Sequence, residues 1–249
     1  MPLLTVLSPA RAGGLAFIDE TYASLVAQRM PDGWDWEWVL QIDDLDAALP
    51  AGLSDPRVRV GHGPRGGPSV ARNLGLARSN GSLVRNVDVD DVLLPGALAR
   101  DVLTLDDDPT LGWVTSAAVD LGPDEVPDGQ GGAHAYPAGR IRRGMVRRWV
   151  TEHQWALPVH PTTLCARRDL VLALGGWTAL PSGGDTALLL ALDAVSDGHF
   201  LDQPSVHYRK HPDQITAQPL HSRPDLLAAR RALSLDRARA LSELGWQYP

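Results

Sequence analysis

The alternation of short apolar segments with longer helical ones is the feature that most constrains how this chain can fold. Runs of strand length cover Leu3–Leu7, Trp36–Ile42, Val58–Val60 and Ser82–Val87. Between them, residues 17–29 and 70–78 carry helical spacing, and Pro68 stands where a helix accepts a first-turn proline. This order predicts an α/β fold.

The second half of the chain continues the alternation less regularly. The patterns predict strands over 113–119, 162–165 and within 200–208, and helices over 95–105, 140–148, 169–174, 186–195 and 224–244. Asn80-Gly81 is predicted to end the preceding helix in the left-handed conformation. Residues 120–139 are rich in Gly, Pro and Asp and predict a long binding loop or lid.

Composition narrows the class of protein. A chain of 249 residues fits one large domain, and 30 acidic against 23 basic residues give a net charge of −7, which argues against a nucleic-acid partner. The single cysteine, Cys165, excludes an intramolecular disulfide framework and a cysteine-based zinc site. No targeting segment or membrane-spanning run is apparent, so we expect a cytoplasmic protein.

Three carboxylates follow one of the predicted strands. Asp88, Asp90 and Asp91 come directly after residues 82–87, and open α/β sheets bind ligands at the carboxyl ends of their strands. Carboxylates this close repel one another unless a cation or hydrogen-bond donors offset their charge. Hard oxygen ligands suit Mg²⁺ or Mn²⁺. By itself, however, such a cluster is more often an acidic turn in solvent than a metal site.

Several short motifs stand at fixed offsets around this cluster. Residues 71–75 read Ala-Arg-Asn-Leu-Gly, and Asp88-Val-Asp90-Asp91 is followed by Pro95. Further on stand Gly175-Gly176-Trp177, Gly184-Asp185 and Tyr208-Arg209-Lys210-His211-Pro212. Together these motifs resemble glycosyltransferase family 2, in which the corresponding segments are Ala-Arg-Asn-x-Gly, Asp-x-Asp-Asp, Gly-Gly-aromatic, Glu-Asp and Tyr-Arg-x-His-Pro.

The resemblance implies an inverting enzyme of the GT-A fold that moves a sugar from a nucleoside diphosphate to an acceptor hydroxyl. It implies an α/β architecture with a central mixed sheet flanked by helices and a Rossmann-like nucleotide-binding half. On this basis residues 1–249 form a single domain. We expect a nucleotide-sugar-binding half over 1–97, an acceptor-binding half over 98–222 and a C-terminal helix over 223–249.

The resemblance also assigns roles to particular side chains. A departing nucleoside diphosphate develops negative charge, which a Mn²⁺ or Mg²⁺ ion would offset. Inversion by direct displacement needs one base to take the acceptor proton, and by position that base is Asp185. The implied metal ligands are Asp88, Asp90 and His211, and the implied nucleotide contacts are Asp43, Arg72, Asp88 and Lys210.

Two departures from the family pattern keep alternatives open. Gly184 replaces the glutamate of the Glu-Asp pair, which permits a non-catalytic nucleotide-sugar-binding module on the same fold. The segment after the first strand, Ser8–Gly13, lacks the family's Pro-x-Tyr-Asn type of sequence, so the donor base stays open. A haloacid-dehalogenase-like phosphatase fits poorly, because it needs a lysine between its acidic motifs and Lys210 follows both.

The acceptor is also open: a glycan, a lipid-linked molecule or a small molecule would each fit. The arginines over 140–148 form either a solvated face or a surface for an anionic acceptor or a membrane. The helix over 224–244 is predicted to dock on its own domain, on a second copy of the chain or on a membrane surface. Trp34, Trp36 and Trp38 alternate as residues on one face of a strand do.

Overall fold

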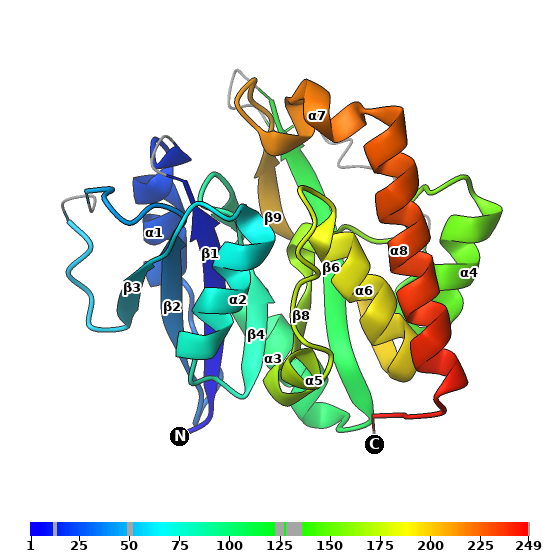
Figure 1. Ribbon diagram of the computed structural model, residues 1–249. Helices are drawn as coiled ribbons and strands as arrows, with labels where there is room; N and C mark the ends of the chain where they lie inside the picture. The colour runs from blue at the N-terminus through cyan, green and yellow to red at the C-terminus, as the bar shows by residue number, and fades with distance from the viewer. Residues whose placement is uncertain (12–13, 49–51, 123–126, 128–135, 249) are drawn as a thin grey trace.

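The structure is a computed structural model, which describes residues 1–248 except 12–13, 49–51, 123–126 and 128–135. Figure 1 shows the chain as one central sheet with helices on both of its faces. The elements in chain order are β1 (Leu3–Ala10), α1 (Ile18–Val26), β2 (Asp35–Ile42), β3 (Val58–His62), α2 (Pro68–Arg78), β4 (Leu83–Asn86), β5 (Val92–Leu93), α3 (Ala97–Asp107), β6 (Leu111–Leu121), β7 (Gly139–Ile141), α4 (Met145–Glu152), η2 (Pro161–Thr163), β8 (Cys165–Arg167), α5 (Arg168–Ala173), α6 (Gly184–Val195), β9 (Asp197–Arg209), η3 (Ile215–Ala217), α7 (Pro219–Ser222) and α8 (Pro224–Glu243).

The described strands form one mixed, 9-stranded sheet. Its order is β3-β2-β1-β4-β8-β6-β9-β5, and β7 pairs with β9. The first four strands of this order pair in parallel, whereas β8 runs antiparallel to both β4 and β6. The expected α/β fold with a central mixed sheet is confirmed. Because β4 pairs with β8, the predicted nucleotide-binding and acceptor-binding halves share this sheet.

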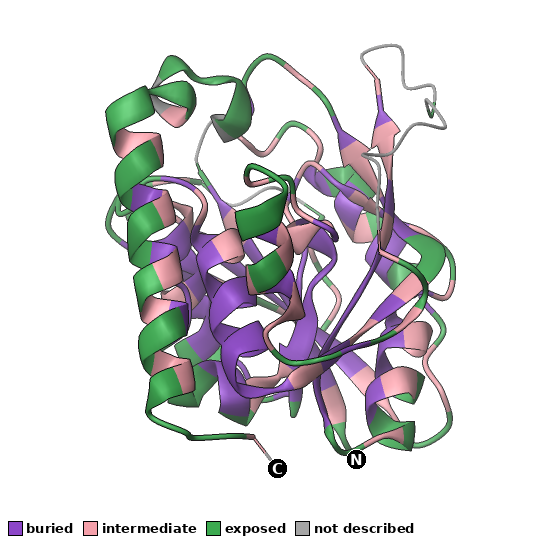
Figure 2. Ribbon diagram, turned by 90° about the vertical axis from the view of Figure 1, so that its right-hand side faces the viewer, coloured by how far each residue is buried: buried purple, intermediate pink, exposed green. Residues whose placement is uncertain are grey.

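Strand β1 shows how the two-residue period of a strand builds both layers of the core. Leu4 and Val6 belong to the hydrophobic cluster that contains Leu25 of α1 and Leu98 of α3. Leu7 points to the opposite face and joins the cluster that contains Leu76 of α2 and the apolar residues of α6. Figure 2 shows these inner surfaces as buried, while α8 is exposed along its outer side.

Glycine brings α2 close to the sheet. A β-carbon added at Gly75 would lie 2.3 Å from Cδ1 of the buried Leu7 on β1, so any other residue at this position would require Leu7 or the helix to shift. Pro68 occupies the first turn of α2, as predicted. The glycine of the Ala-Arg-Asn-x-Gly motif therefore sets the distance between α2 and the sheet.

The tryptophans of β2 and the C-terminal helix agree with the sequence. Trp36 and Trp38 are fully buried in the same cluster, as their alternation predicts. Helix α8 docks on its own domain against α6, one of the predicted alternatives. It buries Arg230, Ser234 and Ala238, while Leu235 and Leu241 pack partly buried against the core. Among the described helices, none is both long and apolar enough to cross a membrane.

Three local predictions are wrong. Helix α2 ends at Ser79 in an extended conformation (φ −75°, ψ 146°), without a left-handed residue at Asn80 or Gly81. The arginine-rich segment begins as strand β7, which pairs with β9, and α4 starts only after Gly144, whose φ of 81° separates the two. The segment predicted as a strand over 162–165 is mostly the 3₁₀ turn η2, and the strand follows at Cys165–Arg167.

Most of the long loop expected over 120–139 lies outside the described residues. At its edges, β6 continues to Leu121, which forms a bridge with Pro127, and β7 begins at Gly139. The two-residue strand β5 was not predicted, because a segment this short shows no periodicity.

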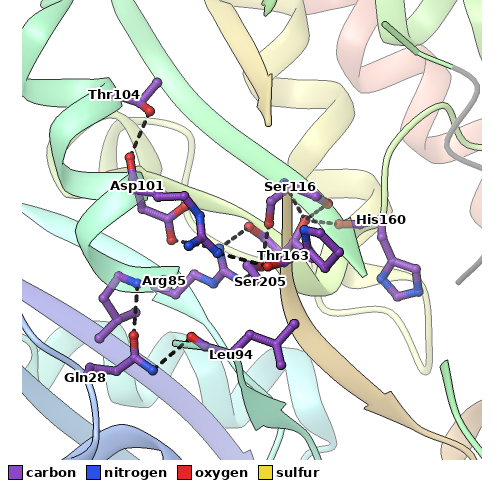
Figure 3. Close-up of polar contacts among 12 residues, drawn as sticks. Gln28, Arg85, Leu94, Asp101, Thr104, Ser116, His160, Thr163 and Ser205 are labelled. Atoms are coloured by element: carbon purple, nitrogen blue, oxygen red, sulfur yellow. Dashed lines mark hydrogen bonds and ion pairs between the residues drawn. The ribbon is translucent and has the colours of Figure 1, made fainter. Parts of the chain in front are cut away.

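One buried arginine connects several elements of the sheet. Arg85 of β4 is fully buried and donates to Oδ2 of Asp101 on α3 (2.7 Å), the carbonyl of Thr163 (2.6 Å) and Oγ of Ser205 on β9 (2.7 Å). Figure 3 shows these partners around the guanidinium, with Ser116 bonded to Ser205. We call Arg85, Asp101, Thr163 and Ser205 the Arg85 centre. Burial raises the pKa of Asp101 to about 6, although Arg85 opposes this.

Candidate active site

Four segments that are far apart in sequence meet at one end of the sheet. They are the turn after β4, the side of α2, the start of α6 and the end of β9. Each brings a charged or polar side chain from a strand end or helix to this point. The carboxyl ends of parallel strands are where α/β sheets bind ligands, so this arrangement marks the candidate site.

Arg72 of α2 lies at the middle of this arrangement. Its guanidinium donates to Oδ1 of Asn86 (2.8 Å) and to Oδ1 of Asp88 (2.5 Å), and Nη1 lies 3.4 Å from Oδ2 of Asp185. The Arg72 side chain is only 4% exposed, whereas those of Asp88 and Asp185 are 34% and 27% exposed. We call Arg72, Asn86, Asp88 and Asp185 the Arg72 centre. It fixes two solvent-accessible carboxylates through one buried cation.

The Asp185 carboxylate is oriented by three donors. Besides Arg72, its Oδ1 accepts the indole N–H of Trp177 (2.8 Å) and the amide of Asn86 (3.2 Å). Sequence reasoning identified Asp185 but missed both Asn86 and this role of Trp177. The position of Asn86 at the end of β4, two residues before Asp88, was the available signal.

Asn73 explains how Trp177 is held. Its side-chain amide donates to the carbonyl of Trp177 and its Oδ1 accepts the Trp177 backbone N–H, each at 2.8 Å. Gly176 makes room for this pairing, because a β-carbon there would lie 2.2 Å from Oδ1 of Asn73. The Ala-Arg-Asn-x-Gly and Gly-Gly-aromatic motifs thus bind each other and together position Asp185.

The turn after β4 gathers the three aspartates that the sequence singled out. A carboxylate oxygen from each of Asp88, Asp90 and Asp91 lies within 4.8 Å of the others. Asp91 is fully buried and accepts the backbone N–H of Arg209 (3.1 Å) and the hydroxyl of Thr162 (3.2 Å). Asp91 therefore holds the turn in place on its buried side, while Asp88 and Asp90 remain partly exposed.

The end of β9 supplies basic groups to this turn. His211 Nε2 lies 2.9 Å from Oδ2 of Asp90, and Nε of Arg209 donates to the backbone carbonyl of Asp90 at 3.0 Å. Arg209 also pairs with Glu20 of α1 at 2.5 Å. The Tyr-Arg-x-His-Pro segment thus places His211 against the aspartates, as the resemblance implied, whereas the role of Arg209 was missed.

The carboxylates are held close together in a partly water-excluded place. Burial raises the pKa of Asp88 to about 6, as do the charges of Asp90 and Asp185, while Arg72 opposes the shift. Burial and the two neighbouring aspartates raise the pKa of Asp91 well above its usual range. For Arg72, burial is outweighed by the charges of Asp185 and Asp88, and its pKa is raised.

A divalent cation fits this donor set. The carboxylate oxygens are close enough to share one ion, they are hard ligands, and their mutual repulsion is what a cation would relieve. Asp88 and Asp90 are the exposed members that would hold it, with His211 within reach of Asp90. An imidazole nitrogen beside carboxylates is compatible with Mn²⁺.

Two of the expected nucleotide contacts have other partners in this structure. The two oxygens of Asp43, which follows β2, accept the backbone N–H groups of Gly66 and Gly67 at 2.8 Å each. Asp43 therefore holds the loop that leads into α2. Lys210 directly follows β9, and its Nζ lies 3.3 Å from Oδ2 of Asp120 and 4.3 Å from the centre of the Tyr208 ring.

The fold of the chain matches that of known structures. The chain superimposes on the 1–349 fragment of S. aureus TarS in complex with UDP-GlcNAc with a TM-score of 0.71, at 18% identity, over 94% of this chain and 65% of that one. For the same fragment without the sugar nucleotide, the TM-score is 0.65 at 17% identity, over 84% of this chain and 60% of that one. The superposition confirms the expected fold, which is of the GT-A type.

The first half of the chain resembles a known family in sequence. Residues 6–128, which contain the Arg72 motif and the three aspartates, match the model of glycosyl transferase family 2. Among curated proteins, no sequence matches the chain significantly. The chain spans less than two thirds of the length of the TarS fragments and 37% of a longer TarS chain.

Proposed function

We propose that this protein transfers a sugar from a nucleoside-diphosphate donor to an acceptor hydroxyl with inversion at the sugar carbon. The family match and the GT-A fold support the reaction class. TarS has been crystallised with UDP-GlcNAc and with UDP. A UDP-sugar is therefore the first donor to test. These findings favour the transferase over the phosphatase alternative.

The single observation that carries the proposal is the pairing of two aspartates through Arg72. Asp88 on the nucleotide side and Asp185 on the acceptor side lie on opposite nitrogens of one buried guanidinium. A donor bound at Asp88 would then present its sugar near Asp185. Asp185 would take the proton from the attacking hydroxyl, with Trp177 and Asn86 fixing the direction of its carboxylate.

A divalent ion on Asp88 and Asp90 would supply positive charge for the departing diphosphate. The protein's own contribution is positional. Asp91 anchors the turn through Arg209 and Thr162, and His211 restrains Asp90. In the proposed complex, Asp43 would also contribute to nucleotide binding by holding the loop at Gly66 and Gly67 close to the base or ribose.

Thermal unfolding with UDP, GDP, dTDP or CDP, each with Mn²⁺ or with EDTA, tests donor binding. Saturation at about a hundred times the dissociation constant adds roughly 2.7 kcal/mol to stability. We expect a rise in melting temperature for UDP that disappears in EDTA. A rise for another nucleotide would identify a different donor, and no rise with any of them would contradict the proposal.

The Asp185→Asn variant tests the reaction. It preserves the shape of the side chain but removes the base, so release of UDP from a UDP-sugar should fall by about a thousandfold or more while UDP binding is retained. Asp225→Asn is a matched control, because Asp225 is an exposed carboxylate that pairs with Arg223 at the start of α8. Full UDP release by Asp185→Asn would remove Asp185 from the mechanism.

A specific observation keeps a second function in view. The Asp185 carboxylate already accepts two hydrogen bonds and pairs with Arg72, and Gly184 replaces the neighbouring glutamate of the family pattern. A non-catalytic nucleotide-sugar-binding module would bind UDP with Mn²⁺ and release none of it from a UDP-sugar. In that case Asp185→Asn would behave like the unmodified protein.

A further inference from the structure

A group of arginines lies at the opposite end of α6 from Asp185. Asp185 is in the first turn of α6, and Val195, its last residue, borders a cavity of about 370 Å³ that is also lined by Arg140, Arg142 and Arg143. The rise of an α-helix separates Asp185 from Val195 by roughly 15 Å along the axis. The cavity is therefore distinct from the proposed active site.

A second cavity adjoins the first. Its volume is about 510 Å³, and it lies between the start of α4 and the middle of α8, with Arg143, Arg147, Arg148 and Arg239 in its lining. Arg143 borders both cavities. Six arginines thus converge on one edge of a chain whose net charge is −7. We call these two cavities with their arginines the arginine hollow.

Ion pairs neutralise only part of this charge. Arg140 pairs with Asp108 (2.9 Å) and Asp197 (2.7 Å), and Arg239 pairs with Asp236 (2.8 Å). Among the described residues, no carboxylate forms an ion pair with the other four, which are Arg142, Arg143, Arg147 and Arg148. Glu152 is the single acidic residue lining the second cavity. The hollow therefore carries an excess of positive charge.

The donors offered to a ligand are guanidinium groups rather than the end of a helix. The first backbone N–H groups of α4, at Val146 and Arg147, already donate to the carboxylate of Asp193 at 3.0 Å each. The side chains of Arg143 and Arg148 are exposed and form no hydrogen bond with a described residue. Guanidinium groups bind the paired oxygens of both phosphate and carboxylate. A phosphate group carries about −1.5 to −2 charge at pH 7, more than a carboxylate, so an excess of positive charge favours phosphate.

From this geometry we infer that the arginine hollow is a second binding site, which takes a phosphate-bearing ligand. The chemistry it recognises is the phosphate oxyanion, and its source is either a soluble phosphorylated compound or the headgroups of an anionic lipid surface. Concave walls on two sides and several guanidinium groups favour a ligand with more than one phosphate. The inference does not depend on the reaction proposed for the Arg72 centre.

Calorimetric titration with sodium tripolyphosphate in EDTA tests the site without a divalent ion. The test variant is Arg143→Gln/Arg148→Gln, and the matched control is Arg29→Gln/Arg223→Gln. The control removes the same charge at exposed positions elsewhere. We expect the unmodified protein and the control to bind tripolyphosphate equally well. The dissociation constant of the test variant should be at least about tenfold higher.

Sedimentation with lipid vesicles distinguishes the source of the phosphate. Vesicles containing phosphatidylglycerol are compared with pure phosphatidylcholine, using the same two double variants. The inference is supported if Arg143→Gln/Arg148→Gln loses binding and the control variant does not. Loss with tripolyphosphate identifies a soluble phosphorylated ligand, and loss with the anionic vesicles identifies a lipid surface. The inference is overturned if neither probe binds, or if both double variants weaken binding equally.

Discussion

The Arg72 centre and the Arg85 centre use the same chemistry with opposite results. Each has a buried arginine facing an aspartate, at 2.5 Å for Arg72 with Asp88 and 2.7 Å for Arg85 with Asp101. In the Arg85 centre both side chains are fully buried, whereas Asp88 and Asp185 are about a third exposed. The fully buried ion pair of Arg85 and Asp101 holds secondary-structure elements together. In the Arg72 centre the carboxylates are accessible to solvent, so a ligand can bind to them.

The two centres differ in the exposure of the carboxylates rather than in the exposure of the arginine. Exposed carboxylates allow the Arg72 centre to bind a ligand, whereas the buried carboxylate of the Arg85 centre serves the fold. Both arginines are nearly inaccessible, at 3% for Arg72 and 0% for Arg85. Replacing either removes one cation, but the aspartates left behind differ in whether water can reach them. Four predictions test this difference, and they begin with the largest effect.

Arg85→Met is expected to lower the free energy of unfolding by about 3–5 kcal/mol, because Asp101 would be left buried without its cation. Arg85→Met/Asp101→Leu removes both charges and should recover most of the loss. Denaturant unfolding of the two variants measures this. If the double variant is no more stable than the single one, the cost lies in the bonds to Thr163 and Ser205 instead.

Arg72→Met is expected to slow release of UDP from a UDP-sugar by about 10²–10³-fold, the usual effect of losing one positioned donor. It should cost less stability than Arg85→Met, since water reaches Asp88 and Asp185. Initial rates and denaturant unfolding on one preparation give both quantities. A stability loss as large as that of Arg85→Met would show that the two centres are equivalent.

Asp193 extends the comparison to a buried carboxylate that forms no ion pair with any described residue. Burial raises its pKa from 3.8 to about 6, although the backbone N–H groups of Arg147 and Val146 lower it. Between these values the folded state binds more protons than the unfolded state, so stability falls as pH rises from about 4 to 6. The shift corresponds to about 3 kcal/mol.

Asp193→Asn should remove this dependence. The stability of the unmodified protein relative to the variant should decrease by about 2–3 kcal/mol between pH 4 and pH 7, measured by denaturant unfolding. Asp225→Asn is the control, because the hydrogen bond from Arg223 lowers the pKa of the exposed Asp225 below 3.8. Its effect on stability lies below this range, so the control difference should stay nearly constant between pH 4 and pH 7. A constant difference across this range would mean that Asp193 titrates normally.

Trp177→Phe probes the orientation of Asp185 and has the smallest expected effect. It keeps an aromatic ring but removes the N–H that Asp185 accepts, so UDP release should slow by about tenfold, equivalent to one hydrogen bond to a charged group. Trp113→Phe is the matched control, because Trp113 is also buried and its indole N–H has no described partner. Equal slowing in both variants would point to lost packing.

Much of the fold and part of the site followed from local sequence patterns. The period of β1 and β2 predicted both strands and the burial of Trp36 and Trp38. Asp88 and Asp90 were found because they follow a strand, and Arg72 and Asp185 because their motifs resemble a family. These features are contained in a few neighbouring residues, which is why one sequence is enough to find them.

The remaining features depend on contacts between distant residues. Asn86 reaches Asp185 across 99 positions and Arg85 reaches Ser205 across 120, and neither distance leaves a local trace. An arginine inside a strand of four buried residues contradicts the apolar pattern that predicts such a strand. Strand β7 forms where the arginines suggest a helix, because β9 offers it a partner.

The double hydrogen bond between Asn73 and Trp177 has a consequence for evolution. Oδ1 of Asn73 occupies the space that a side chain at position 176 would need, so neither residue can be replaced freely while the other stays. Asn73 lies inside the segment matched by the family model, and Gly176 lies beyond its end. A constraint on a residue of the matched half therefore also constrains a residue of the other half. We expect positions 73 and 176 to co-vary among related sequences.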